Sequence, residues 1–151
     1  MLIAERQALI AGCCVSASNR LSLVPRFFMA IKTILLVDDD EKHLMLHAMI
    51  LKQAGFRPIT TVVGANTMGV YENENPALIF LDYQLNSSVD ARQVAGLLKQ
   101  QFPNAPLIVL SARDTMPDDM KGLASGFLHK GDPADLVKMA RKLLNQEQKS
   151  A

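Results

Sequence analysis

Hydrophobic residues in this chain group into short runs, which are separated by segments with a helical period. The first run, Ile34-Leu35-Leu36-Val37, has the length and branched composition of a strand buried on both faces of a parallel sheet. Pro58 falls in the next strand-like segment, and because proline cannot donate to a central ladder, we expect that strand at an edge of the sheet. Besides the first strand, four more are expected, over residues 56–63, 77–82, 107–110 and 126–130.

The segments between the strands predict helices, because their hydrophobic residues recur every three or four positions. Gly55 is a C-terminal stop for the first helix, and Asp132 followed by Pro133 marks the start of the last one. Strands that alternate with helices imply a doubly wound α/β domain, in which helices cover both faces of a parallel sheet. Five helices are expected, over residues 40–54, 67–72, 89–102, 117–124 and 133–144.

The composition is that of one globular domain. The chain has 151 residues, of which 49% are hydrophobic and 21% are charged, enough to form a proper core. A formal net charge of +1 gives no overall field that would favour nucleic acid or an anionic membrane as a partner. Cys13 and Cys14 are adjacent and cannot form a disulfide framework, so a reducing, cytoplasmic location is expected.

Residues 1–30 are interpreted as an N-terminal extension that is poorly ordered, and residues 148–151 as a tail. The apolar stretch over residues 8–15 is too short to span a bilayer. Ile10-Ala11-Gly12-Cys13 resembles a bacterial lipoprotein cleavage box, but the match is four residues long and the apolar stretch before it is thin. Met29 stands just before the first strand, so the residues ahead of it are read as a segment upstream of the working domain.

Reactive side chains stand at the ends of four predicted strands. The first strand ends in Asp38-Asp39-Asp40, the third in Asp82, the fourth in Ser111 and the fifth in Lys130. The carboxyl ends of the strands in an open parallel sheet share one edge, so these side chains are expected to lie together. Three consecutive carboxylates repel one another unless a cation is held there, and Mg²⁺ (or Mn²⁺) with oxygen ligands is the simplest such cation.

These residues suit phosphoryl transfer. Asp82 is the candidate nucleophile, which would attack phosphorus to give an acyl phosphate. Catalysis of this kind depends on charge and donors around the phosphoryl oxygens. Lys130 supplies a positive charge, Ser111 a hydroxyl, and Ala112 leaves room for its backbone N–H.

Three neighbouring polar residues have simpler interpretations. Asp40 suits the start of the helix that follows it, and is expected to cap that helix more than to bind the metal. His43 and His47 are four residues apart and have the spacing of a metal-binding pair on one helix face. No third ligand or accompanying motif follows them, so they are interpreted as solvated helix residues.

Taken together, the motifs resemble the receiver domain of bacterial two-component response regulators. The likeness rests on Ile34 to Asp40, Leu78 to Asp82, Ile108 to Ala112 and Gly126 to Lys130, and it covers residues 31–147. It implies a flavodoxin-like, five-stranded parallel sheet in the order 2-1-3-4-5. The second strand, which was placed at an edge on other grounds, lies at an edge in that order.

The resemblance also implies a role for each residue of the site. Asp82 is the implied phosphoacceptor, which receives phosphate from a sensor histidine kinase or a phosphotransfer protein. The implied metal ligands are Asp38 through water, Asp39 directly, Asp82, and the backbone carbonyl of Gln84. The implied phosphoryl-stabilising and switch residues are Ser111, Ala112, Lys130 and Phe127.

By the same resemblance, the protein is a single-domain regulator and not a turnover enzyme. Phosphorylation is expected to draw Ser111 inward and shift Phe127, altering the face formed by the last two helices and the fifth strand. The expected partner on that face is a downstream target protein. Direct contact with nucleic acid or with a membrane is not expected.

One residue and one loop depart from the family pattern. Gly131 replaces the proline that usually follows the lysine, and residues 86–91 replace the usual Pro-Gly-Met-Asp-Gly loop after the phosphoacceptor. The second change bears on the loop around Gln84, and so on metal affinity and phosphate lifetime.

Two other functions stay open at this point. A phosphohydrolase of the haloacid-dehalogenase type would use Asp38 as nucleophile and Asp40 as general acid. Against it, Lys42 is unusual for that group, and Asp118-Asp119 falls in a predicted helix where the group needs an acidic pair at a strand end. The other alternative is an adaptor with the receiver fold that works without phosphorylation.

Overall fold

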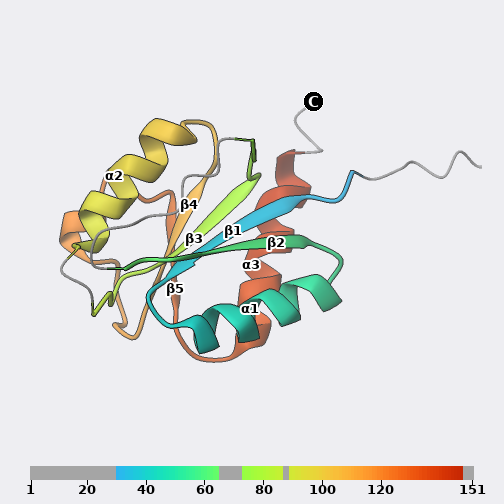
Figure 1. Cartoon of the computed structure of the whole chain (residues 1–151), viewed down its shortest axis with the longest axis horizontal. Helices are drawn as coiled ribbons and strands as arrows, with labels where there is room; N and C mark the ends of the chain where they lie inside the picture. The colour runs from blue at the N-terminus through green and yellow to red at the C-terminus, as the bar shows by residue number, and fades with distance from the viewer. Residues whose placement is uncertain (1–29, 65–72, 87–88, 148–151) are drawn as a thin grey trace, which may run out of the picture.

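The computed structural model describes residues 30–64, 73–86 and 89–147 (Figure 1). The helix predicted over residues 67–72, nearly all of the N-terminal extension and the tail lie outside the described residues. The strands are β1 (Thr33–Asp38), β2 (Arg57–Val62), β3 (Leu78–Asp82), β4 (Leu107–Ser111) and β5 (Gly126–His129). The helices are α1 (Glu41–Gln53), α2 (Ala91–Gln101), α3 (Pro133–Glu147) and the 3₁₀-helix η1 (Asp118–Met120).

The five strands form one parallel sheet in the order β2-β1-β3-β4-β5, which confirms the predicted fold. β2 is an edge strand, as its proline requires, and Pro58 lies opposite Ile34 of β1. The chain extends the sheet in one direction from β1 to β2 and in the other direction from β3 onward. The carboxyl ends of β1 and β3 therefore border the crevice in which doubly wound sheets bind ligands.

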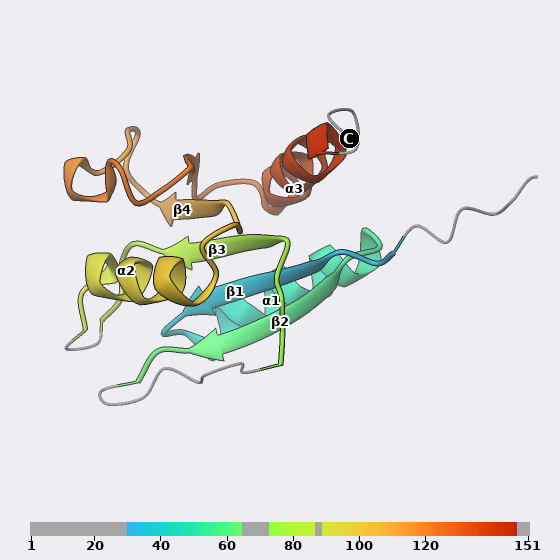
Figure 2. The same cartoon turned by 90° about the horizontal axis from the view of Figure 1, so that it is seen from above.

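Each face of the sheet has its own hydrophobic core, because successive side chains of a strand point to opposite faces. Helices α1 and α3 lie side by side over one face, and α2 lies over the other (Figures 1 and 2). The α1 and α3 face buries the even-numbered strand residues Ile34, Leu36, Leu78, Phe80, Ile108 and Leu110. The α2 face buries the odd-numbered strand residues Leu35, Val37, Ile79, Leu81, Leu107 and Val109.

Helix ends follow the predicted capping signals. The Asp40 side chain accepts a hydrogen bond from the backbone N–H of Lys42 at 2.8 Å and caps α1, as expected. Asp132 accepts from the backbone N–H of Ala134 at 2.8 Å, just ahead of α3. Gly55 follows α1 with a φ of 94°, a left-handed conformation that side chains other than glycine rarely adopt.

The helix predicted over residues 117–124 is wrong. This segment contains the short helix η1 and no α-helix, and Lys121 directly after it is extended. Gly122 has a φ of 87°, which no right-handed helix can accommodate. Met120 is fully buried in the core beneath α2, so the turn is held in place by that side chain. The described residues thus contain three α-helices where the sequence predicted four.

Candidate functional site

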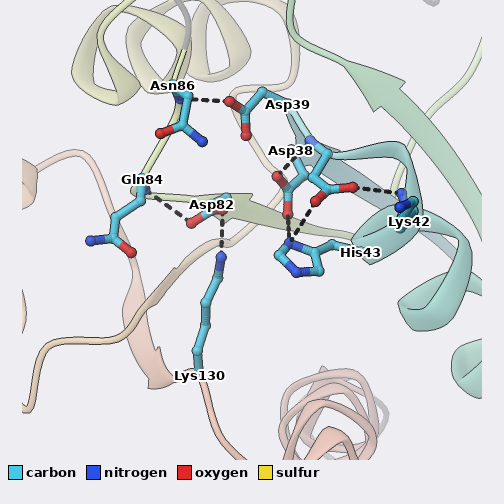
Figure 3. Close-up of polar contacts among 9 residues, drawn as sticks. Asp38, Asp39, Lys42, His43, Asp82, Gln84, Asn86 and Lys130 are labelled. Atoms are coloured by element: carbon cyan, nitrogen blue, oxygen red, sulfur yellow. Dashed lines mark hydrogen bonds and ion pairs between the residues drawn. The ribbon is translucent and has the colours of Figure 1, made fainter.

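The predicted site residues lie at the carboxyl edge of the sheet (Figure 3). Asp38 is the last residue of β1 and Asp82 the last of β3, and each is 2% exposed. Ser111 ends β4 and is fully buried, and Lys130 follows β5 directly. The sheet therefore brings together at one edge residues that are up to 92 positions apart in the chain, as the order of the strands requires.

Asp82 is held from two sides. The Nζ atom of Lys130 lies 2.5 Å from Oδ2 of Asp82, and the backbone N–H of Gln84 donates to Oδ1 at 2.9 Å (Figure 3). The side chain of Lys130 is 23% exposed and that of Asp82 is 3% exposed. A buried carboxylate is stable only with such compensation, because its desolvation is otherwise costly. Lys130 thus supplies the cationic partner that a buried carboxylate needs.

Asp38 has weaker compensation. The backbone N–H of Asp40 donates to Oδ1 of Asp38 at 3.0 Å, but Oδ2 is buried and has no hydrogen-bond partner within the part of the chain that the structure describes. Burial and, to a smaller extent, the negative charge of Asp82 together raise the pKa of the Asp38 carboxyl to about 6, against the opposing effect of the Asp40 N–H. The unpartnered oxygen marks a place for a cation or a proton.

The residues at this edge fit a divalent metal with oxygen ligands. A cleft of about 440 Å³ opens beside them, lined by Asp39, Asp40, His43, Asp82, Gln84, Leu85, Asn86 and Lys130. One ligand atom each from Asp38, Asp82 and His43 lie within 4.8 Å of one another. Two buried carboxylates, one of them with a free oxygen, are what Mg²⁺ or Mn²⁺ would bind.

Two of the other predicted metal ligands make different contacts. Oδ2 of Asp39 accepts a hydrogen bond from the backbone N–H of Asn86 at 2.5 Å, so this carboxylate is directed at the loop after β3 (Figure 3). Gln84 is exposed, and its N–H is the group that meets Asp82. Asp40 lines the cleft while it caps α1.

The predicted switch residues Ser111, Ala112 and Phe127 lie on β4, directly after it, and on β5. Oγ of Ser111 accepts a hydrogen bond from the backbone N–H of Arg113 at 3.1 Å, Ala112 is exposed, and Phe127 is half-buried on β5. The guanidinium of Arg113 stacks over the ring of Tyr83, 5.2 Å from its centroid. Ser111 is thereby linked to the residue that directly follows Asp82.

Sequence reasoning missed the contribution of His43. Its Nδ1 atom lies 3.6 Å from Oδ2 of Asp38 and 3.9 Å from Oδ2 of Asp40. His47 does not share this cluster: its ring stacks on that of His43 with 6.5 Å between centroids, and burial lowers its pKa. A usable signal was the position of His43 three residues after the cap Asp40, since helix side chains lean toward the N-terminus.

This sheet order and its polar edge define a flavodoxin-like α/β domain with an acidic site. The family model for the response regulator receiver domain matches residues 34–141, and the chain belongs to that family. Receiver domains are signalling modules.

Two curated relatives are transcriptional regulators by name. The alkaline phosphatase synthesis regulatory protein PhoP of Bacillus subtilis is 36% identical over 95 residues, which are 63% of this chain and 39% of PhoP. The corresponding protein SphR of Synechococcus elongatus is 30% identical over 141 residues, which are 85% of this chain and 54% of SphR. The chain thus spans about half or less of the length of these relatives.

Solved structures show the same fold. A CheY-like receiver domain protein from Methanospirillum hungatei superposes with a TM-score of 0.68 at 22% identity, over 81% of this chain and 100% of that one. NtrX from Brucella abortus gives a TM-score of 0.67 at 25% identity, over 80% of this chain and 28% of NtrX. None of the helices in the described ranges is long and apolar enough to cross a membrane.

Proposed function

We propose that this chain works as a response regulator receiver and that Asp82 is its phosphoacceptor. The phosphoryl donor is the phosphohistidine of a sensor histidine kinase or a phosphotransfer protein. The observation that carries the proposal is the buried Asp82 carboxylate, which is paired with Lys130 at 2.5 Å and stands beside the cleft. A carboxylate that attacks phosphorus must be held in position next to a cation, and the contact of Asp82 with Lys130 supports this role.

In the reaction, a carboxylate oxygen of Asp82 attacks phosphorus and the bond from phosphorus to the histidine nitrogen breaks. The products are an acyl phosphate on Asp82 and a free histidine on the donor. Mg²⁺ (or Mn²⁺), held by Asp38, Asp39, Asp82 and the backbone carbonyl of Gln84, would neutralise phosphoryl charge when bound. Lys130 contributes a second positive charge, and its contact with Asp82 keeps it in place for the phosphoryl oxygens.

The switch begins at Ser111. If its hydroxyl and the N–H of Ala112 turn to the phosphoryl group, the hydrogen bond from Arg113 to Ser111 must change. Arg113 stacks on Tyr83, and the Tyr83 hydroxyl donates to Asp119 of η1 at 3.2 Å, so the change reaches η1. Because η1 replaces the predicted fourth helix, the docking face consists of η1, β5 with Phe127, and α3.

The output of this domain is the docking of a downstream target protein, in the cytoplasm. The net charge of +1 supports a protein target over direct contact with nucleic acid. PhoP and SphR are named as transcriptional regulators, and the matched residues are 39% of PhoP and 54% of SphR.

The test is incubation of the protein with acetyl phosphate and Mg²⁺, followed by intact mass measurement. One phosphate adduct is expected, and it should disappear in Asp82→Ala but persist in the control Asp132→Ala, whose exposed carboxylate caps α3. Absence of an adduct on the unaltered protein would refute the phosphoacceptor proposal and favour the adaptor. Turnover of a generic phosphomonoester that survives Asp82→Ala but not Asp38→Ala would favour the phosphohydrolase.

A further inference from the structure

His43 reaches the acidic site because of where α1 begins. Asp38 and Asp82 continue the even-numbered rows of the sheet, which face α1 and α3. His43 lies in the first turn of α1 and leans back toward the carboxyl end of β1. Figure 3 shows its ring beside Asp38 on the side of the site opposite Asn86. Its side chain is 54% exposed, so it can move without disturbing the core.

The contact between His43 and Asp38 is not a hydrogen bond. The distance of 3.6 Å from Nδ1 to Oδ2 exceeds hydrogen-bond length, and Oδ2 has no other hydrogen-bond partner among the described residues. Two ligands of one tetrahedral zinc ion, each about 2.1 Å from the metal, lie about 3.4 Å apart. The observed separation therefore leaves room for one ion that touches both atoms.

We propose that His43 is a third protein ligand of the acidic site, and that the site binds Zn²⁺ through Asp38, His43 and Asp82 in competition with Mg²⁺. The ligand atoms of these three residues lie within 4.8 Å of one another. An imidazole nitrogen favours zinc and other late first-row metals, whereas Mg²⁺ prefers oxygen alone. Zinc binds histidine nitrogens and carboxylate oxygens, and open sites hold it with three protein ligands and leave a fourth position free.

The proposal rests on the proposed function in one respect, since zinc and phosphate compete for Asp82. Zinc engages the carboxylate that would attack phosphorus, and it also weakens the ion pair with Lys130. Zinc is therefore expected to lower the yield of the phosphate adduct that forms with Mg²⁺, which would regulate phosphorylation through metal supply.

The test measures metal binding by calorimetry on the full chain. A Cys13→Ser, Cys14→Ser background removes the two thiols, which are strong zinc ligands in their own right. ZnCl₂ and MgCl₂ are titrated separately into this protein, into His43→Gln, and into the control His47→Gln. His47 stands on the same helix but outside the cluster. Imidazole NMR signals identify the histidine that binds.

His43→Gln is expected to weaken zinc binding by about tenfold or more and to leave Mg²⁺ binding within about twofold. His47→Gln should match the parent protein, and zinc should perturb the His43 ring signals. Equal zinc affinity in His43→Gln and the parent overturns the proposal, as does an equal loss in His47→Gln. Phosphate adduct formation with Mg²⁺ in the same proteins is a separate readout, so the phosphoacceptor role and the zinc site can each fail alone.

Discussion

Asp38→Asn is expected to stabilise the protein when no divalent cation is bound. Burial, helped by the charge of Asp82, raises the pKa of the Asp38 carboxyl from 3.8 to about 6, although the N–H of Asp40 opposes it. The ionised form of Asp38 is therefore costly in the folded protein. Asparagine keeps the shape of the side chain and can still accept from Asp40, so the substitution removes the charge and little else.

The sign follows from proton linkage. The Asp38 carboxyl titrates near 3.8 in the unfolded chain and near 6 in the folded protein, so between these values the folded protein binds more protons. The stability that protonated Asp38 contributes is fully present below about pH 4 and is lost as the pH rises through about 6. A pKa difference of this size corresponds to about 3 kcal/mol, which is the upper limit of the gain for Asp38→Asn at neutral pH.

The assay is urea unfolding with a chelator present, at a series of pH values from acid to neutral. Asp38→Asn should have a higher free energy of unfolding than the parent protein, and this difference should grow as the pH rises from about 4 through about 6. Asp132→Asn is the control: this carboxylate is exposed, and asparagine caps helices as well as aspartate does, so its profile should follow that of the parent. Parallel curves for the parent and Asp38→Asn would refute the reasoning.

Two more substitutions test the ion pair and a turn. Lys130→Met leaves Asp82 buried without its cation, so the free energy of unfolding with a chelator should fall by about 3 kcal/mol, and the acetyl phosphate adduct should be reduced. Unchanged stability would mean that Asp82 is solvated in the absence of Lys130. Gly55→Ala puts a side chain at a φ of 94° and should cost about 1 kcal/mol in urea unfolding. Gly96→Ala in α2, where the added methyl meets no atom, should instead stabilise slightly, and equal effects at both sites would contradict the conformational argument.

The sheet could be predicted because its causes are local. The run from Ile34 to Val37 is apolar on both faces, and such a run is a strand of a parallel sheet wherever it occurs. The place of Pro58 at an edge follows from its missing N–H. Strand-end residues such as Asp82 then share one edge for any order of parallel strands. The full strand order depended on the likeness to a known family.

The features that were not predicted correctly from the sequence depend on contacts between distant segments. The helix predicted over residues 117–124 was defeated by burial of Met120 under α2 and by the left-handed backbone of Gly122. Glycine in a helix-like pattern costs only about 1 kcal/mol, so the sequence did not reveal which conformation it adopts. The spacing from Asp40 indicates that His43 leans toward the start of α1, but its distance from Asp38 depends on how α1 sits over the end of β1.

The two buried carboxylates, Asp38 and Asp82, differ in how their charges are compensated. Asp82 is paired with Lys130 within the protein, and this contact holds its carboxylate beside the cleft. Asp38 has no such partner at Oδ2 within the described residues, and its charge is balanced only by a proton or by a bound cation. Stability without metal and affinity for metal should therefore change in opposite directions at this position. Asp38→Asn should raise stability without metal and lower the affinity for metal. The free energy that an ionised Asp38 costs the folded protein is the free energy that favours binding of the cation.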